Sequence, residues 1–242
     1  MDVTTGKRAL RAIKRKRRGG FTLVEAMIVV AIVGIVMAAA APNVSRYFEH
    51  GRGRAAAKSI ADALNMARGQ AIRTGNNQVV FFSVMNGGVP AGDTGGAPLT
   101  DHSGIRVPVL VLDDGAPGSA NQNCLIDAGE GRITFPAQLG VGWGANAPPA
   151  ATEAPDDDAV TAIPADGSSF RAPDGTPNMT WVQFRPDGVP VAIDNACNSG
   201  QLGSGGGTIY LQTAKRDYAI TLSPLGGVRV HTWDVATGGW TL

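Results

Sequence analysis

The residues with the clearest chemistry lie near the start of the chain, around the peptide bond between Gly20 and Phe21. Hydrolysis of that bond would leave a positively charged amine on Phe21. Glu25 follows about one helical turn later, and it is the only charged residue between Phe21 and Ala41. A carboxylate inside a membrane helix is costly, on the order of 3 kcal/mol at the helix centre. We therefore expect the Glu25 carboxylate to pair with such an amine, within the molecule or on a neighbouring copy.

Catalytic side chains are sparse in the rest of the chain. No group of His, Cys and Asp has the spacing of metal ligands, and the histidines fall on a predicted helix, a loop and a late strand. They are His50, His102 and His231. There is no glycine-rich phosphate-binding loop and no Gly-x-Ser-x-Gly sequence. We expect a protein that is not an enzyme and that carries no cofactor and no metal.

The two cysteines, Cys124 and Cys197, are the only ones in the chain. In an oxidising compartment such a pair predicts a disulfide, which would restrict the unfolded chain by a few kcal/mol. Two unpaired buried thiols are the alternative, because the sequence does not show whether the Cα atoms come within bonding distance.

Acidic clusters offer oxygen atoms that could hold calcium. They lie at Asp113–Asp114, at Asp127–Glu130 and at Asp156–Asp158. None has the twelve-residue spacing of an EF-hand loop. We interpret these residues as solvated acids in turns.

The elements around the Gly20–Phe21 junction indicate a membrane anchor. Residues 21–41 form an apolar segment that would span roughly 30 Å as a helix, the thickness of the hydrocarbon core. The leader, residues 1–20, carries eight Lys or Arg and one acid. This charge bias predicts a cytoplasmic N-terminus and a C-terminal part outside the cytoplasm.

A second, amphipathic helix is predicted over residues 42–75. Pro42 removes a backbone donor and should kink or loosen the helix, while Gly51 and Gly53 should weaken the next turns. One apolar stripe has helical spacing and should cover a sheet: Ala56, Ile60, Ala63, Leu64, Ala67, Ala71 and Ile72. The run Thr74–Asn77 should end the helix, because Gly and Asn tolerate left-handed geometry.

Residues 76–242 are predicted to form one β-rich head. Period-2 apolar runs with short connections predict an antiparallel meander. The runs are 78–85, 105–112, 179–184, 208–213, 218–222 and 228–233. Pro108 favours an edge position or a bulge for its strand, and residues 86–104 and 137–178 read as loops. A helix followed by an antiparallel sheet gives an α+β fold.

The N-terminal residues resemble a known signal. Gly20, the run Phe21-Thr22-Leu23-Val24-Glu25, Gly34 inside the apolar helix and Pro42 at its end are similar to the class III signal of type IV pilins and type II secretion pseudopilins. The resemblance implies that a prepilin peptidase of the inner membrane cuts after Gly20 and methylates the amine of Phe21. It also implies that Glu25, with Thr22 near it, acts in filament assembly.

The C-terminal residues resemble the closing region of the GspH/FimT family of minor pseudopilins and minor pilins. Arg185–Gly188, the charged turn at Lys215–Asp217 and Gly226–Val230 carry this resemblance. It implies a minor pseudopilin of a type II secretion system, which assembles through its N-terminal helix into the pseudopilus tip. The alternative is a minor type IV pilin that acts in pilus assembly, adhesion or DNA uptake.

DNA binding is not expected for this chain. Some FimT-like members bind DNA through Gly-Arg-x-Arg, whereas Gly226–Arg229 here lacks the first arginine. The remaining candidates are Lys215, Arg216 and Arg229. Without the leader, 13 bases face 19 acids, a net charge of about −6, which does not favour phosphate contacts. We interpret these cations as solvated charges of hairpins.

A soluble periplasmic enzyme or binding protein with an ordinary signal peptide is the competing class. Ala39–Ala41 offers small residues for its cleavage, but Glu25 and the length of the apolar segment disagree with an ordinary signal. The pair Arg17–Arg18 could suggest twin-arginine export, and Lys14–Arg18 a nucleic-acid patch. Membrane anchoring already accounts for these charges. The expected location is the bacterial inner membrane, in a single pass, with extraction into a filament. The expected partners are the peptidase, membrane lipid, other minor subunits and the major subunit.

Overall fold

The computed structural model describes residues 21–83, 85–86, 89–90, 96–147, 154, 163–164, 166–234 and 237–242, without the side chains of 41–46, 85–86 and 89–90. Gly20 and the rest of the leader lie outside the described residues, as do Asp156–Asp158. The chain divides into two compact units, Met1–Ser45 and Arg46–Leu242, and each is described here by itself. We call the second unit the head.

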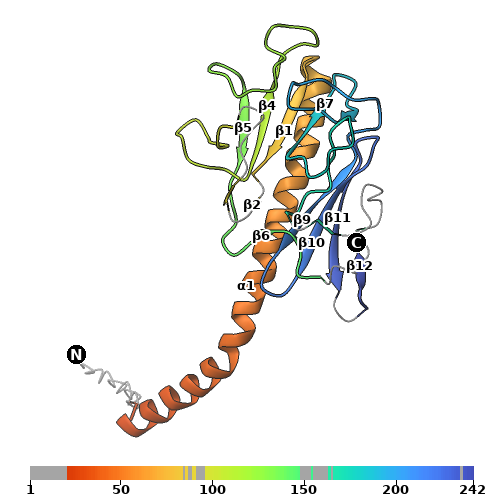
Figure 1. Ribbon diagram of the computed structural model, residues 1–242. Coiled ribbons are helices and arrows are strands. Elements are labelled where there is room, and N and C mark those ends of the chain that lie inside the picture. The colour runs from red at the N-terminus through yellow and green to blue at the C-terminus, as the bar shows by residue number, and fades with distance from the viewer. Residues whose placement is uncertain are drawn as a thin grey trace, which may run out of the picture. The chain divides into compact units, whose positions relative to one another are not determined.

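One helix, α1, runs from Leu23 to Thr74 and contributes to both units (Figure 1). The helix is continuous across Pro42, so this proline does not end it, and the kink expected there stays a prediction. In the first unit, Leu23–Ala40 is long and apolar enough to cross a membrane, and none of it is buried within the chain.

In the head, α1 buries most of the stripe that the sequence predicts. Ala56 is partly buried against the core, and Ile72 is 56 % exposed. The other members of the stripe are buried: Ile60, Ala63, Leu64, Ala67 and Ala71. Ile72 lies about 100° around the helix from Ala71, and this rotation carries it off the buried face. The helix ends as expected, because Gly75 adopts a left-handed φ of 73° and its N–H donates to the Ala71 carbonyl.

The first of two five-stranded antiparallel sheets has the order β5-β4-β1-β7-β8. Its strands are β1 (Gln78–Phe82), β4 (Val109–Asp113), β5 (Arg132–Phe135), β7 (Trp181–Phe184) and β8 (Pro190–Val191). The central strand β1 is buried at every position, and it pairs with β4 and β7. A separate pair joins β2 (Met85–Asn86) to β3 (Val89–Pro90).

The second sheet has the order β12-β11-β10-β9-β6. Its strands are β6 (Gly142–Trp143), β9 (Gly207–Gln212), β10 (Asp217–Leu222), β11 (Val228–Asp234) and β12 (Gly239–Thr241). Strands β9 to β11 form the predicted meander, in which Ile220 of β10 pairs with Ile209 of β9 and Val230 of β11.

Two features of the sheets differ from the sequence prediction. The described residues of the head form two five-stranded sheets and the β2–β3 pair, and the short strands β3, β5, β6, β8 and β12 were not expected. The edge position or bulge predicted from Pro108 is wrong, because β4 begins after this proline and lies between β5 and β1. Because Pro108 lies outside the strand, its missing backbone N–H removes no hydrogen bond from the sheet.

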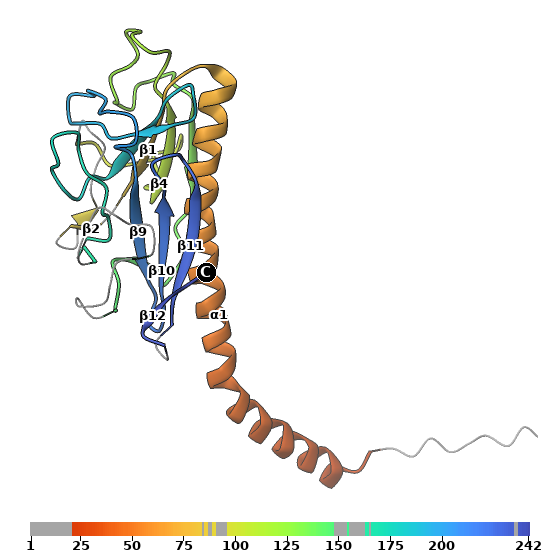
Figure 2. The same cartoon turned by 90° about the vertical axis from the view of Figure 1, so that its right-hand side faces the viewer.

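The head half of α1 lies along the strands in both views (Figure 2). One core cluster joins its buried stripe to both sheets: Leu64 and Ala67 of the helix, Phe81 of β1, and Ile209 and Ile220 of β9 and β10 belong to it. Burial of the stripe against strands accounts for the stability of this half of the helix. The α+β, pilin-like architecture is therefore confirmed.

Candidate functional site

Glu25 lies in the first turn of α1, where Thr22 caps the helix. The Glu25 N–H donates to Thr22 Oγ1 at 3.2 Å, and the Ala26 N–H donates to the Thr22 carbonyl at 3.1 Å. The pattern Thr-x-x-Glu is that of a capping box. A carboxylate is also favourable at a helix N-terminus, which carries a partial positive charge. The structure thus gives Glu25 a local role at the start of the helix, which the sequence analysis did not include.

The apolar side chains of the first unit are exposed on all sides of the helix. Phe21, Leu23 and Ile35 are each more than 70 % exposed. Gly34 adds no contact, since a Cβ built there meets no atom within 4 Å. A helix that is apolar all round requires lipid or other chains to cover it.

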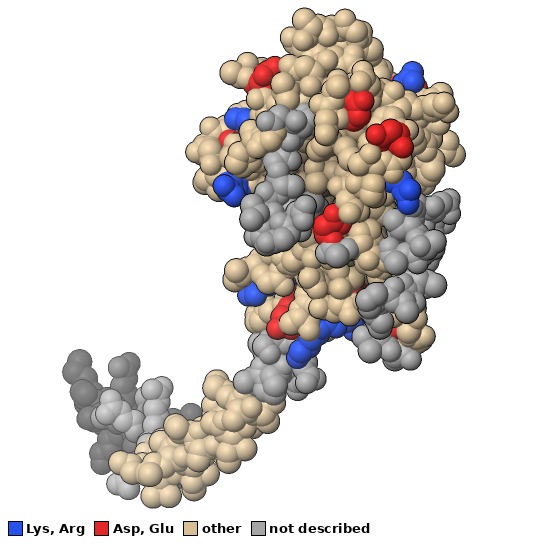
Figure 3. Space-filling view, in the orientation of Figure 1, with Lys and Arg blue, Asp and Glu red and all other residues tan. Residues whose placement is uncertain are grey.

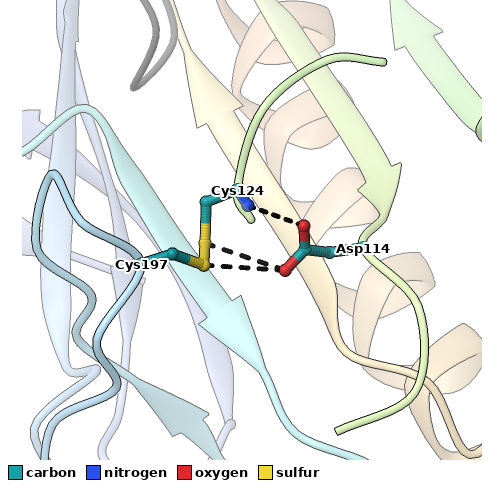
Figure 4. Close-up of side chains that lie close together, drawn as sticks. All are labelled: Asp114, Cys124 and Cys197. Carbon is teal, nitrogen blue, oxygen red and sulfur yellow. Dashed lines mark hydrogen bonds between the residues drawn. A yellow bond between two sulfur atoms is a disulfide. The ribbon is translucent and has the colours of Figure 1, made fainter. Parts of the chain in front are cut away.

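In the head, the structure joins Cys124 and Cys197 in a disulfide with a Cα–Cα distance of 5.5 Å (Figure 4). Cys124 belongs to the loop between β4 and β5, and Cys197 to the loop between β8 and β9. Both residues have left-handed backbones, with φ of 56° and 61°. The bond therefore clamps two loops of unfavourable local conformation onto each other.

Asp114, the residue after β4, lies against this disulfide (Figure 4). Its carboxylate accepts the N–H groups of Asn123 and Cys124, and one oxygen is 3.7 Å from each sulfur. Burial raises the pKa of Asp114 to about 6, although the two N–H donors act in the opposite direction. The nearby acids Glu130 and Asp113 raise this pKa further, so the charged form of Asp114 is poorly stabilised.

The three groups do not make a metal site in this state. The Asp114 oxygen and the two sulfurs lie within 4.8 Å of one another, but metal ligation requires thiolates, and the sulfurs are bonded to each other. In the acidic loop, Asp127 accepts from the Asn123 side chain, and Glu130 accepts from the Asp127 N–H. These acids serve the loop's own hydrogen bonds.

The cations that the sequence analysis considered for DNA do not gather. Lys215 and Arg216 lie in the β9–β10 turn, whereas Arg229 pairs with Thr221 near the other end of β10. Thr221 lies four positions after Asp217 along the strand, or about 13 Å away. The exposed positions of Lys215 and Arg216 fit solvated hairpin charges.

The structure instead brings the β9–β10 turn to two arginines of α1 that the sequence analysis did not single out. Arg52, Arg54 and Arg216 line a groove of about 550 Å³, together with Tyr47, Phe48, His50, Gly51, Ala55, Gln138, Tyr218 and Thr232. We call this the basic groove, and Lys215 lies beside it in the turn. Figure 3 shows Lys and Arg side chains at this lower end of the head.

Gly53 permits this arrangement, because it lies between the two arginines where the helix meets the hairpin. A Cβ at this position would overlap the Tyr218 ring and lie 2.8 Å from Thr213 Cγ2. The Tyr218 hydroxyl donates to the His50 carbonyl at 3.4 Å. The sequence signal for this contact was Arg-Gly-Arg inside a helix, where glycine is otherwise unfavourable.

His50 of the groove has three cations and one acid near it. Burial lowers the pKa of His50, and the charges of Arg216, Lys215 and Arg54 lower it further, while Glu49 acts against them. The other two histidines lie apart from it: His102 accepts from Arg132 in a loop, and His231 is buried on β11.

Comparison with known proteins identifies the N-terminal segment. Residues 15–41 match the prokaryotic N-terminal methylation motif, which is the class III prepilin signal. The matched range contains Gly20, Phe21 and Glu25. No curated protein and no solved structure gave a match. The motif supports the class of type IV pilin-like proteins and pseudopilins, and it implies processing by prepilin peptidase and assembly with other pilins. With the apolar helix, it is consistent with a membrane-anchored chain.

Proposed function

We propose that this chain is a minor pseudopilin of a type II secretion system, a structural and non-enzymatic subunit of the pseudopilus tip. The observation that carries the proposal is the methylation motif at residues 15–41. The exposed apolar helix that follows it and the α+β head with its own core support the proposal.

The mechanism begins with insertion of the apolar helix in the inner membrane, with the leader in the cytoplasm. Prepilin peptidase cuts after Gly20 and methylates Phe21. The new amine and the Glu25 carboxylate of neighbouring subunits then form ion pairs, which removes the cost of an uncompensated acid in an apolar environment. The exposed helices pack together as the filament core, and the head contacts other minor subunits and the major subunit.

A minor type IV pilin is the alternative within the same class, because pilins and pseudopilins share this N-terminal motif. Co-purification of the crosslinked native assembly separates the two. Recovery with the pseudopilins of a secretion system supports the proposal, whereas recovery with pilus subunits supports the alternative.

Mass spectrometry of the mature N-terminus tests the class itself. We expect a chain that starts at a methylated Phe21. In a Gly20→Asp variant we expect the leader to be retained, because the residue before the cut is changed. A native chain that starts at Pro42 would show an ordinary signal peptide and a soluble protein, and it would reject the proposal.

A further inference from the structure

We propose that the basic groove binds the headgroups of anionic phospholipids in the membrane that holds the N-terminal helix. This inference rests on the proposed function, because it requires the segment Leu23–Ala40 to be inserted in a bilayer.

The groove concentrates positive charge in a chain that is otherwise acidic. Four of the 13 bases that follow the leader are Arg52, Arg54, Lys215 and Arg216, while the net charge of residues 21–242 is about −6. The ion pairs of the described residues, such as Lys58–Asp62, involve none of these four cations. Guanidinium and ammonium groups that form no ion pair among the described residues are suited to phosphate oxygens, which they bind by charge-assisted hydrogen bonds. Glu49, which acts on His50, offsets part of the positive charge.

The fold holds these cations in place although the two pairs are about 160 residues apart in the sequence. The β9–β10 turn is fixed by hydrogen bonds between Thr213 and Arg216: the Thr213 N–H donates to the Arg216 carbonyl at 2.8 Å, and the Arg216 N–H donates to Thr213 Oγ1 at 3.1 Å. The close approach at Gly53 seats this turn on the helix. The positive charge therefore belongs to a defined groove with fixed walls.

The position of the groove along the chain favours lipid as the occupant. Tyr47 and Phe48 line it with side chains that are 76 % and 58 % exposed, and exposed aromatic rings next to a span are typical of the membrane interface. Arg52 is twelve residues beyond Ala40, or about 18 Å of helix. Helical side chains point back toward the N-terminus. Along the chain, the groove therefore begins within about four helical turns of the end of the span.

Other occupants fit the geometry less well. Duplex DNA needs a row of cations along its phosphates, whereas Arg229 lies near the other end of β10. An acidic surface on a second copy of the chain would account for the cations of the groove but not for the exposed rings of Tyr47 and Phe48.

The test uses the full chain in vesicles of phosphatidylcholine and phosphatidylglycerol, with a spin label on one lipid at a time. The restricted fraction of each labelled lipid gives the selectivity of the protein. We expect Lys215→Gln with Arg216→Gln to lower the preference for phosphatidylglycerol at least about twofold, because each cation near a charged surface contributes measurably to attraction. High salt should reduce the native preference through screening.

A variant with Arg73→Gln and Arg106→Gln is the matched control, since it removes the same charge from exposed sites outside the groove. The leader is common to all variants, so its eight bases contribute equally to the lipid selectivity of each and do not affect the comparison. A loss of selectivity in the turn variant but not in the control supports the proposal. Equal selectivity in both variants overturns it. The proposal is also overturned if the turn variant keeps its selectivity but loses binding to a DNA duplex or crosslinking between copies.

Extraction with alkaline carbonate separates this inference from the proposed function. A native chain that stays in the pellet is anchored in the membrane. The lipid selectivity then tests only whether the basic groove binds anionic headgroups. A native chain that is released contradicts both the anchor and the lipid site.

Discussion

The two units of the chain differ in where their apolar side chains find contacts. In the first unit the apolar residues of α1 are exposed on all sides, whereas in the head the same helix buries a stripe against two sheets. The first unit is therefore complete only in lipid or beside other chains, and the head carries its own core. One continuous helix therefore has two requirements for burial. Its first part needs lipid or other chains to cover its apolar side chains, whereas its second part is covered by the sheets of the same chain.

The largest expected effect would come from Glu25→Ala, which changes the first unit alone. Without this carboxylate the amine of a neighbouring Phe21 stays uncompensated, and uncompensated charge in an apolar environment costs on the order of 3 kcal/mol. We expect at least about tenfold less subunit in sheared filaments and unchanged membrane insertion. Asp62→Ala, at an exposed ion pair of the head, is the control. Normal incorporation of Glu25→Ala would contradict the charge pairing.

The disulfide gives the next largest effect, and it concerns the head alone. Replacing Cys124 and Cys197 by Ser opens a loop of 73 residues, and loop-closure entropy predicts a loss of about 4 kcal/mol in the free energy of unfolding. Urea denaturation followed by tryptophan fluorescence measures this loss, because all four tryptophans lie in the head: Trp143, Trp181, Trp233 and Trp240. Equal midpoints for the native and the double variant chain would show that the bond does not stabilise the head.

The buried stripe of α1 sets the third effect. Leu64 is fully buried, so Leu64→Ala should lower the stability of the head by about 3 kcal/mol. Ile72→Ala should change it by less than about 0.5 kcal/mol, since this side chain is largely exposed. Val30→Ala, in the first unit, should leave the fluorescence transition unmoved. Similar losses of stability for all three variants would contradict the view that only the head buries its part of the helix within the chain.

The pH dependence of the head gives an effect of similar or smaller size. The pKa of Asp114 is about 6 in the folded state, mainly because of burial, against about 3.9 when unfolded. The folded state therefore binds the proton more tightly. The contribution of Asp114 to the free energy of unfolding should be largest below pH 4 and should be lost as the pH rises through 6, by roughly 3 kcal/mol at most.

The variant Asp114→Asn isolates this contribution, because its amide does not titrate in this range. Denaturation midpoints between pH 4 and pH 7 should fall more steeply for the native chain than for the variant. Parallel curves would mean that Asp114 titrates alike in the folded and unfolded states.

The smallest effects compare two glycines of one helix. Gly51→Ala should stabilise the head by up to about 1 kcal/mol, because a Cβ there meets no atom within 4 Å and alanine is the better helix former. Gly53→Ala should lower stability by about 1 kcal/mol or more, because its Cβ would overlap the Tyr218 ring. Thermal unfolding of both variants measures the difference. Stabilisation by Gly53→Ala would mean that the hairpin does not seat on the helix at this point.

Much of the fold follows from periodicity in the sequence. The stripe from Ile60 to Ala71 and the meander of β9 to β11 repeat at helical and strand periods, and the structure confirms them. The strands that the sequence analysis missed, such as β6 and β8, have only two residues each, which is too short for a period to register. The choice of two sheets depends on pairings between distant segments, which local patterns do not encode.

The sites also differ in how far the sequence predicts them. The N-terminal motif could be recognised from the sequence, because its residues are contiguous and do not depend on tertiary contacts. The basic groove could not, because Arg52 and Arg216 come together only when the hairpin reaches the helix at Gly53. The position of Asp114 against the disulfide likewise depends on tertiary packing.

The bond between Cys124 and Cys197 has a consequence for proteolysis of the head. Strands β5 to β8 lie between the two half-cystines, so a protease that severs the backbone once in this interval opens a ring and releases no fragment. A scission there would become visible on a gel only after reduction. The interval between the cysteines is therefore the part of the head that can be cut once without release of a fragment.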